Sequence, residues 1–255
     1  MNILLNGCTG TMGKVVEGLV KEDEAATITV GTDLRHAACD YPVYQSFDLV
    51  VSTFDVIIDF SHHSMVDALI AFALKMNRPA VICTTGLSQQ TIRLIDEASK
   101  KIPVFRSANM SYGINLIESI LEEYAALMTD SFDVEIIEKH HNRKEDAPSG
   151  TALMLADAVH RATDHRLHNT YGRHGNQAKR LPLELGIHAV RGGTLVGEHE
   201  VIFAGCEEDI TIKHQAQSRA VFARGALRAA HFLMNKEPGL YTMHDLIKED
   251  KNARI

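Results

Sequence analysis

Asn2-Ile-Leu-Leu-Asn-Gly-Cys-Thr-Gly-Thr-Met-Gly13 sets the architecture of this 255-residue chain. The apolar run Asn2–Leu5 predicts a strand buried on both faces, and the apolar spacing of residues 15–20 predicts a helix. Strand, glycine turn and helix in this order are the context in which glycines indicate dinucleotide binding. The spacing is Gly-x-x-Gly-x-x-Gly, so an ordinary glycine-rich turn stays open as an alternative.

The glycine turn is a candidate site for a pyrophosphate, because glycines let it approach the backbone and a helix N-terminus favours its charge. We expect cofactor contacts from Gly7, Cys8, Thr9, Gly10, Thr11, Met12 and Gly13. Asp33 follows a predicted strand at 27–32 and is placed to bind the adenosine ribose, although a simple turn role also fits. Arg35 could meet a 2′-phosphate, so NADH and NADPH both stay open, with NADH slightly favoured.

The pattern continues with alternating strands and helices. Predicted strands at 55–60 and 79–83 alternate with helices at 65–76 and 91–100. This order is typical of an α/β fold with a Rossmann-like, doubly wound parallel sheet. Ligands bind at the carboxyl ends of such strands, so the segments after Ile82 and after Phe105 should line the cofactor site. Residues 36–54 are predicted to be loop with a short strand near 41–44.

A second polar stretch concentrates ionisable side chains. Val134, Ile136 and Ile137 predict a strand that breaks into a loop with one anion, Glu145. The cationic or titratable residues of that loop are Lys139, His140, His141, Arg143 and Lys144. Such clustering is electrostatically unfavourable unless an anion binds there.

The loop leads into a predicted helix over 152–159. Pro148, Ser149 and Gly150 are typical of a helix start, whose free N–H groups bind carboxylate or phosphate. The sequence therefore predicts a two-sided anion clamp in which imidazoles and a lysine supply protons. A solvated surface turn is the alternative. We expect no metal, because Lys144 would compete with a cation and no zinc-like spacing of Cys or His lies nearby.

The segment Glu138-Lys-His-His-Asn-Arg-Lys-Glu-Asp-Ala-Pro-Ser-Gly-Thr-Ala152 resembles the signature of the dihydrodipicolinate reductase (4-hydroxy-tetrahydrodipicolinate reductase) family, which acts in the diaminopimelate route to lysine. That family reduces a cyclic imine with two carboxylates, using hydride from a nicotinamide and a proton from the protein. The resemblance implies that His140 is the proton donor and Lys144 a second donor that also pairs with substrate charge. It implies substrate contacts at His141, Gly150 and Thr151.

The resemblance covers nearly the whole chain and includes two loops on the nicotinamide side. Cys83 stands where the family usually has the first glycine of Gly-Thr-Thr-Gly, which places a side chain where backbone normally approaches the cofactor. The implied contacts in these loops are Cys83, Thr84, Thr85, Ser107, Ala108, Asn109 and Met110.

The second half of the chain predicts an α+β domain with a mixed sheet, and a long loop over 163–180. Its strands are expected at 132–139, 186–191, 195–204 and 209–214. We divide the chain into a dinucleotide-binding domain, residues 1–110 and 218–255, and a domain for substrate binding and oligomerisation, residues 111–217. The resemblance implies a homotetramer formed through the second domain's sheet.

Composition limits the remaining possibilities. A net charge of −7 argues against binding to nucleic acid or anionic membranes, and four widely spaced cysteines predict reduced thiols in the cytoplasm. We expect no membrane span and no signal peptide, since the strand pattern begins at Asn2. Two other classes stay open: another two-domain NAD(P)-dependent reductase, which would need a catalytic Cys or another Lys motif, and a non-enzymatic dinucleotide-binding protein, which would not need the proton donors.

Overall fold

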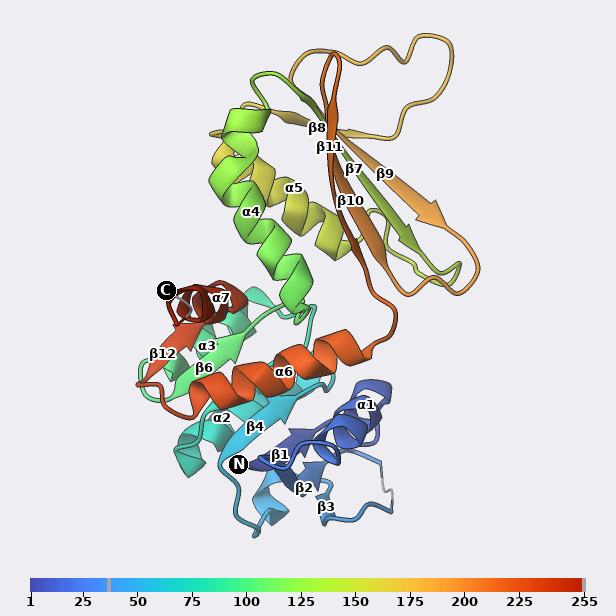
Figure 1. The fold of residues 1–255 in the computed structure, drawn as a ribbon. Helices are drawn as coiled ribbons and strands as arrows, with labels where there is room; N and C mark the ends of the chain where they lie inside the picture. Colours follow the sequence, from blue (N-terminus) through green and yellow to red (C-terminus); the bar gives the residue numbers. More distant parts are fainter. Residues whose placement is uncertain (36–37, 254–255) are drawn as a thin grey trace. The chain divides into compact units, whose positions relative to one another are not determined.

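The computed structural model describes residues 1–35 and 38–253, which form two compact units (Figure 1). Unit 1 is Met1–Tyr112 with Arg219–Ile255, and unit 2 is Gly113–Ser218. The roles of the units in binding cofactor and substrate stay predictions. None of the helices in the described residues is long and apolar enough to cross a membrane.

Unit 1 contains a parallel sheet with the strand order β12-β6-β5-β4-β1-β2-β3. Its strands are β1 Asn2–Asn6, β2 Thr27–Thr32, β3 Val43–Tyr44, β4 Val56–Asp59, β5 Ala80–Ile82, β6 Pro103–Arg106 and β12 Gly239–Tyr241. The chain starts in the middle of the sheet, runs outward through β2 and β3, and then returns to β4 on the other side of β1. The carboxyl ends of β1 and β4 therefore form the switch point where ligands bind in such sheets.

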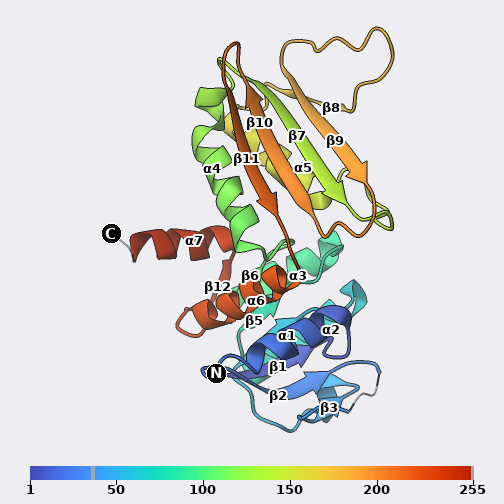
Figure 2. The same cartoon turned by 45° about the vertical axis from the view of Figure 1, so that its right-hand side comes forward.

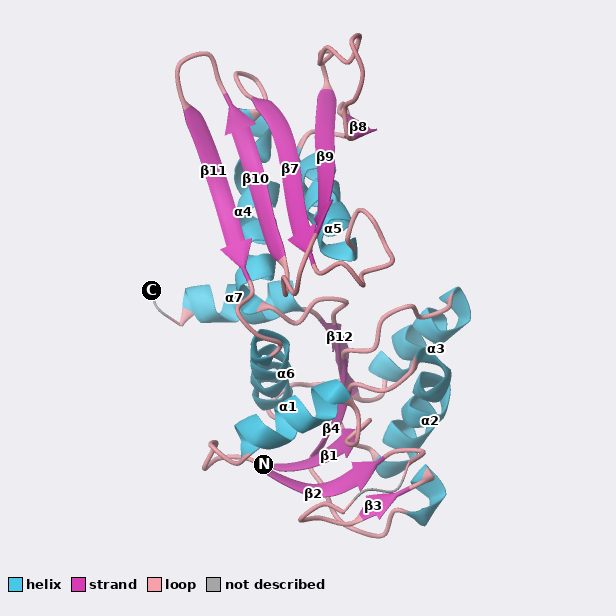
Figure 3. Ribbon diagram, turned by 90° about the vertical axis from the view of Figure 1, so that its right-hand side faces the viewer, coloured by secondary structure: helices cyan, strands magenta, loops and turns pink. Residues whose placement is uncertain are grey.

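Helices cover both faces of this sheet, as predicted (Figure 3). The helices on one face are α1 Thr11–Val20, α6 Ala220–Leu233 and α7 Met243–Asn252, and those on the other are α2 Val66–Met76 and α3 Gln89–Ser99. Alternate residues of β1 separate the two cores: Ile3 and Leu5 pack with α1 and α6, and Leu4 packs with α2. Two short 3-10 turns, Phe47–Leu49 and His63–Met65, complete the unit.

The predicted loop over 36–54 contains β3 as its short strand, which confirms that part of the prediction. Residues 36 and 37 of this loop lie outside the described residues.

Unit 2 has a mixed sheet with the strand order β11-β10-β7-β9-β8 (Figure 2). Its strands are β7 Asp133–His140, β8 His168–Tyr171, β9 Glu184–Arg191, β10 Glu198–Ala204 and β11 Asp209–Gln215. The central strand β7 runs antiparallel to β10 and parallel to β9, which confirms the prediction of a mixed sheet.

Two helices, α4 Tyr112–Met128 and α5 Gly150–Ala162, pack on one face of the sheet in unit 2. Val134 and Ile136 of β7 point into this core, whereas Glu135 and Ile137 lie on the opposite face. Among the described residues of unit 2, no helix covers that opposite face.

One prediction for unit 2 is wrong. The predicted loop over 163–180 contains strand β8, whose sequence His-Asn-Thr-Tyr lacks the apolar alternation of a strand; β8 forms because its backbone pairs with β9. The strand predicted over 132–139 is confirmed as β7, which ends one residue later, at His140, so that Lys139 and His140 lie in the sheet. The pairing of β7 with β9 and β10 on both sides extends it over these polar residues.

Candidate functional site

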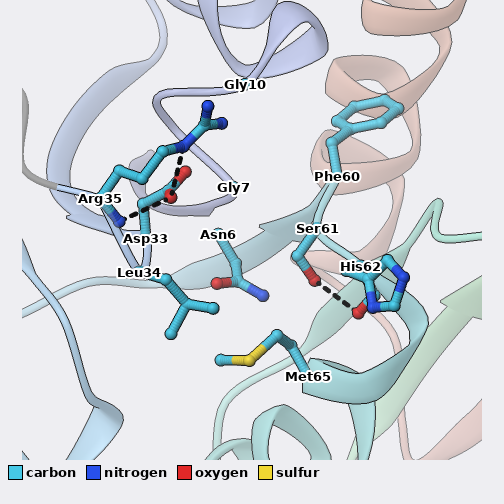
Figure 4. A pocket seen from close by; sticks show the side chains of 10 residues that line it. All are labelled: Asn6, Gly7, Gly10, Asp33, Leu34, Arg35, Phe60, Ser61, His62 and Met65. Carbon is cyan, nitrogen blue, oxygen red and sulfur yellow. Dashed lines mark hydrogen bonds and ion pairs between the residues drawn. The ribbon is translucent and has the colours of Figure 1, made fainter.

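Two cavities lie in unit 1 over the carboxyl ends of its strands. The first has a volume of about 430 Å³ and is shown in Figure 4; it is lined by Asn6, Gly7, Gly10, Asp33, Leu34, Arg35, Phe60, Ser61, His62 and Met65. The second has a volume of about 320 Å³ and is lined by Met12, Phe60, Ser61, Cys83, Thr84, Thr85, Ala108, Met110 and Phe222. Phe60 and Ser61 border both cavities, so the two are adjacent.

The glycine turn between β1 and α1 has room only for glycine at two of its positions. Gly7 has a φ of +80°, and a Cβ there would lie 2.5 Å from the carbonyl oxygen of Phe60. At Gly13, a Cβ would lie 2.3 Å from the carbonyl oxygen of Gly7. The glycines therefore allow β1, α1 and the segment after β4 to approach closely, which leaves the N-terminus of α1 open to a ligand.

Cys8 belongs to the predicted cofactor turn, but its side chain points into the core. The residue is fully buried, and burial is the main cause that raises the pKa of its thiol to about 12. A Cβ on Gly31 would lie 2.8 Å from the Cys8 sulfur, so the thiol packs against β2. Any cofactor contact by Cys8 is therefore made by its backbone.

Asp33 lies at the wall of the first cavity. Its carboxylate accepts hydrogen bonds from the backbone N–H groups of Thr9 and Arg35, both at 3.1 Å. Burial alone raises the pKa of Asp33, but these hydrogen bonds outweigh it and the net pKa is lowered. The Arg35 side chain is 74% exposed and its Nε lies 3.8 Å from the same carboxylate (Figure 4). The first cavity is therefore bordered by the carboxylate of Asp33, which backbone hydrogen bonds hold in place, and by the guanidinium of Arg35, which is free to change its rotamer.

A buried polar network that the sequence did not predict lies under the two cavities. Asp59, at the end of β4, is fully buried and accepts hydrogen bonds from Asn6 Nδ2 (2.8 Å), Ser61 Oγ (2.6 Å) and Thr84 Oγ1 (2.7 Å). Burial raises the pKa of Asp59 despite these donors. The network joins the ends of β1, β4 and β5 and so fixes the floor of both cavities. Polar residues that end buried parallel strands were the signal that could have revealed it.

The two predicted nicotinamide-side loops meet at the second cavity. Cys83, Thr84 and Thr85 line it together with Ala108 and Met110. Cys83 is almost completely buried and its pKa is raised, mainly by burial, so its thiol stays protonated. Among the predicted cofactor residues, those outside the lining of either cavity are Cys8, Thr9, Thr11, Gly13, Ser107 and Asn109.

In unit 2, the end of β7 brings His140 against a buried acid. His140 is 9% exposed, and its Nδ1 lies 2.6 Å from Oε2 of Glu138, which is fully buried. Arg191 at the end of β9 donates to both carboxylate oxygens of Glu138, at 2.8 and 2.7 Å. Burial alone raises the pKa of Glu138, but the hydrogen bonds from Arg191 and His140 outweigh it and the net pKa is lowered. The carboxylate is therefore ionised beside the imidazole.

The start of α5 lies beside this pair. Ser149 is the N-cap, as predicted: its Oγ accepts from the N–H of Ala152 (3.1 Å). Its backbone N–H donates to Glu138 (3.0 Å), and its hydroxyl contacts Nε2 of His199 (2.9 Å). A Cβ on Gly150 would meet nothing within 4 Å, so no other segment crowds the first turn of α5 at this residue.

Carboxylates already occupy much of the predicted cationic loop. Lys139 pairs with Glu198 and with Glu200 (3.3 Å), both on β10. Lys144 Nζ lies 2.8 Å from Asp146, and a hydrogen bond with Lys144 is the main cause that lowers the pKa of Asp146, with a smaller contribution from the N–H of Gly150. The expectation of five cations facing one anion is thus wrong. The clamp holds an internal carboxylate, Asp146, between Lys144 and the start of α5.

The other predicted residues of this stretch lie around the same helix start. His141 and Thr151 are partly buried, whereas Arg143 is exposed to solvent. Among the described residues, no group of three or more His, Cys, Asp or Glu side chains is arranged as a metal site.

His199 predicts a specific pH dependence of stability. Burial, followed by the neighbouring His140, lowers the pKa of His199 to about 4, below its value of 6.5 outside the fold. The unfolded chain therefore takes up a proton that the folded chain does not, and the stability that His199 contributes is lost as the pH falls from about 6.5 towards 4. When the pH falls from about 7 to about 5, the free energy of unfolding should decrease in both proteins, and the decrease should be roughly 2 kcal/mol smaller in His199→Gln than in the wild type.

Urea unfolding of both proteins at the two pH values measures this difference. Equal losses in the two proteins would contradict a neutral, buried His199.

Comparison with known proteins gives concordant matches over both units. Residues 1–110 match the family described as dihydrodipicolinate reductase, N-terminus, and residues 113–247 match dihydrodipicolinate reductase, C-terminus. A 4-hydroxy-tetrahydrodipicolinate reductase of Caldanaerobacter subterraneus is 52% identical over 249 residues, which cover 98% of this chain and 99% of the relative. One of Clostridium novyi is 47% identical over 247 residues, covering 96% and 98%.

The fold has solved counterparts. A dipicolinate-bound dihydrodipicolinate reductase from Paenisporosarcina superposes with a TM-score of 0.79 at 24% identity, covering 95% of this chain and 97% of that one. A probable dehydrogenase from Thermotoga maritima gives a TM-score of 0.63 at 12% identity, covering 96% and 92%. At these identities the likeness concerns the fold alone.

Proposed function

The chain belongs to the dihydrodipicolinate reductase family, and we propose that it is the NAD(P)H-dependent oxidoreductase that reduces the cyclic dicarboxylic imine of the diaminopimelate route to tetrahydrodipicolinate. The observation that carries the proposal is the Glu138–His140 pair beside the start of α5. It provides a proton donor and an anion-binding helix end side by side, which a reductase of an anionic imine requires.

Unit 1 is proposed to bind the dinucleotide and unit 2 the substrate. The glycine turn fits the pyrophosphate. A Cβ on Gly7 or Gly13 would clash with neighbouring backbone, so only glycine allows the turn to pack this closely before the N-terminus of α1. Asp33 is suited to the adenosine ribose, and the second cavity is suited to the nicotinamide. The bound nicotinamide supplies the hydride.

His140 is proposed to give the proton to the substrate through Nε2. Its Nδ1 lies against the ionised carboxylate of Glu138, which can only accept a hydrogen bond, so Nδ1 carries a hydrogen. Nε2 is therefore the nitrogen that can transfer a proton to the substrate. In the charged imidazole both nitrogens carry hydrogens, and transfer from Nε2 leaves the neutral form with Nδ1–H still bound to Glu138. His141 is proposed to contact the substrate.

One carboxylate of the substrate is proposed to bind at the N–H groups of Gly150 and Thr151 and at the ammonium of Lys144. Asp146 accepts hydrogen bonds at this position from Lys144 and from the N–H of Gly150. Its side chain is 57% exposed, so the ion pair with Lys144 is weakly stabilising and can give way to a better-placed anion. Lys144 would also serve as the second proton donor.

Asp33 is expected to set the choice of coenzyme. Replacement of Asp33 by Ser should weaken NADH binding by roughly tenfold, because a hydrogen bond to a charged group stabilises by about 1.5–3 kcal/mol. NADPH should be affected less, since its 2′-phosphate is repelled by the wild-type carboxylate. The ratio of KM values for the two coenzymes measures the effect.

Arg35→Ala is the matched variant, because it removes the neighbouring charge and leaves the carboxylate in place. It should weaken NADPH relative to NADH. An unchanged KM ratio in Asp33→Ser would contradict the assignment of the adenosine ribose to Asp33.

The function is tested by supplying the imine, made in situ by the preceding synthase from pyruvate and aspartate semialdehyde, with either coenzyme. We expect oxidation of the reduced coenzyme only when the imine is present. Coenzyme binding without oxidation would instead support the non-enzymatic binding protein, and oxidation with other carbonyl substrates would support a different two-domain reductase.

We also propose a homotetramer formed through the uncovered face of the sheet in unit 2, and a cytoplasmic location. That face presents Ile137 and Ile202 among paired charges, with Lys213 lying 3.1 and 2.9 Å from Glu198 and Glu200. Neutralised charges and half-buried aliphatic side chains suit a surface that becomes buried between copies. Sedimentation equilibrium should give four chains per particle, and a monomer would contradict the proposal.

A further inference from the structure

Glu138 is a buried charge whose partners come from three different segments. His140 belongs to the same strand, Arg191 ends β9, and Ser149 begins α5. The carboxylate is fully buried, and a buried charge costs free energy unless donors surround it. Two oxygens with four donating contacts meet that requirement, so Glu138 is a fixed point to which these three segments are tied.

Oε2 of Glu138 determines how the imidazole of His140 is presented. The contact with Nδ1 at 2.6 Å fixes the ring orientation and the tautomer, because the carboxylate can only accept. His140 packs on Gly197, where a Cβ would lie 3.1 Å from Nε2, and edge-on to His199 at a centroid distance of 5.1 Å, so the ring has little freedom to turn.

Oε1 of Glu138 positions the start of α5. It accepts the N–H of Ser149 at 3.0 Å, one residue before Gly150. Arg191 strengthens the same link, because its NH2 donates both to this oxygen and to the carbonyl oxygen of Asp146, each at 2.7 Å. The loop that carries Lys144 and Asp146 is thus tied to the carboxylate that orients His140.

We propose that Glu138 is a positioning residue that holds the proton donor His140 in register with the carboxylate-binding start of α5. This inference rests on the proposed function and adds one statement to it. A single buried carboxylate fixes both the proton donor, His140, and the start of α5 that binds the substrate carboxylate. Among the described residues, the charged or titratable groups shown against His140 or its carboxylate partner are Glu138 on its own strand, His199 on β10, and Arg191 on β9 through Glu138.

Glu138→Gln is the first test, because it keeps the shape and removes the charge. A general acid contributes about 10²–10⁴-fold, and loss of its alignment should lower kcat by roughly 10- to 100-fold. The KM for the imine should rise, whereas the Kd for NADH should not change. A wild-type kcat would overturn the proposal.

A double-mutant cycle with His140→Gln separates positioning from a general structural role. If Glu138 acts through His140, then Glu138→Gln in the His140→Gln background should cost little further kcat. An equal loss in both backgrounds would overturn the proposal. If His140→Gln alone kept the wild-type kcat, the assignment of His140 as the proton donor would be wrong. If His140→Gln lost activity while Glu138→Gln kept the wild-type kcat, only the positioning role of Glu138 would be wrong.

Glu138→Asp covers the possibility that the glutamine variant does not fold. It retains the charge on a shorter side chain that cannot keep the 2.6 Å contact with Nδ1 of His140, so kcat should fall. The second readout is the Nδ1 proton of His140 in NMR spectra of the full chain. A downfield signal is expected in the wild type and should move upfield in Glu138→Gln; the same signal in both proteins would contradict the contact.

Discussion

Lys144→Ala should lower kcat by about 10²–10⁴-fold, the range of a general acid, and leave the Kd for NADH unchanged. Nζ of Lys144 lies 2.8 Å from Asp146, at the position proposed for a substrate carboxylate, and the side chain is 22% exposed. Removing the ammonium deprives the bound anion of its counter-charge and the reaction of its second donor. Steady-state kinetics with the imine and fluorescence titration with NADH measure the two quantities separately.

Arg143→Ala is the matched control for this prediction. Arg143 is exposed and lies in the same turn, so its loss removes an equal charge from the loop without touching the clamp. We expect nearly normal turnover from it. If Lys144→Ala abolished NADH binding as well, or if both variants lost activity equally, Lys144 would not have the role proposed here.

Gly225→Ala should destabilise unit 1 by about 3 kcal/mol or more, because overpacking against backbone cannot be relieved by a rotamer change. Gly225 lies in α6, and a Cβ there would be 1.7 Å from the carbonyl oxygen of Met110. Met110 lines the second cavity, so the segment that should contact the nicotinamide must move with it. Urea unfolding and NADH titration should both report the loss.

Gly18→Ala provides the opposite control. Gly18 is an exposed residue of α1, and a Cβ there would meet nothing within 4 Å. Alanine is preferred over glycine in a helix, so this variant should gain roughly 0.5–1 kcal/mol. Similar stabilities for the two variants would contradict the close contact between α6 and Met110.

The sequence predicted those features that depend on local patterns. The residues of β2 were predicted without error, and the glycine turn, the cap at Ser149 and the doubly wound sheet follow from spacing and residue type. The mixed sheet of unit 2 was also predicted, because its longer strands are rich in β-branched residues.

Features that depend on distant partners were not predicted. Strand β8 exists because it pairs with β9, and the charge on Lys139 is balanced by Glu198, which is 59 residues away along the chain. The same is true of Asp59, whose donors come from β1 and from the segment after β5. Glu138 was quoted as part of a motif, but its role became visible only once Arg191 and Ser149 met at its carboxylate.

The segment from Glu138 to Thr151 is proposed to bind a dicarboxylate next to its proton donor. A crystal structure of the protein with NADH and dipicolinate, a planar dicarboxylate, tests it most directly. We expect one carboxylate on the N–H groups of Gly150 and Thr151, with Lys144 Nζ turned from Asp146 towards the ligand and Nε2 of His140 facing its ring. Dipicolinate bound elsewhere, with the Lys144–Asp146 pair intact, would contradict the account.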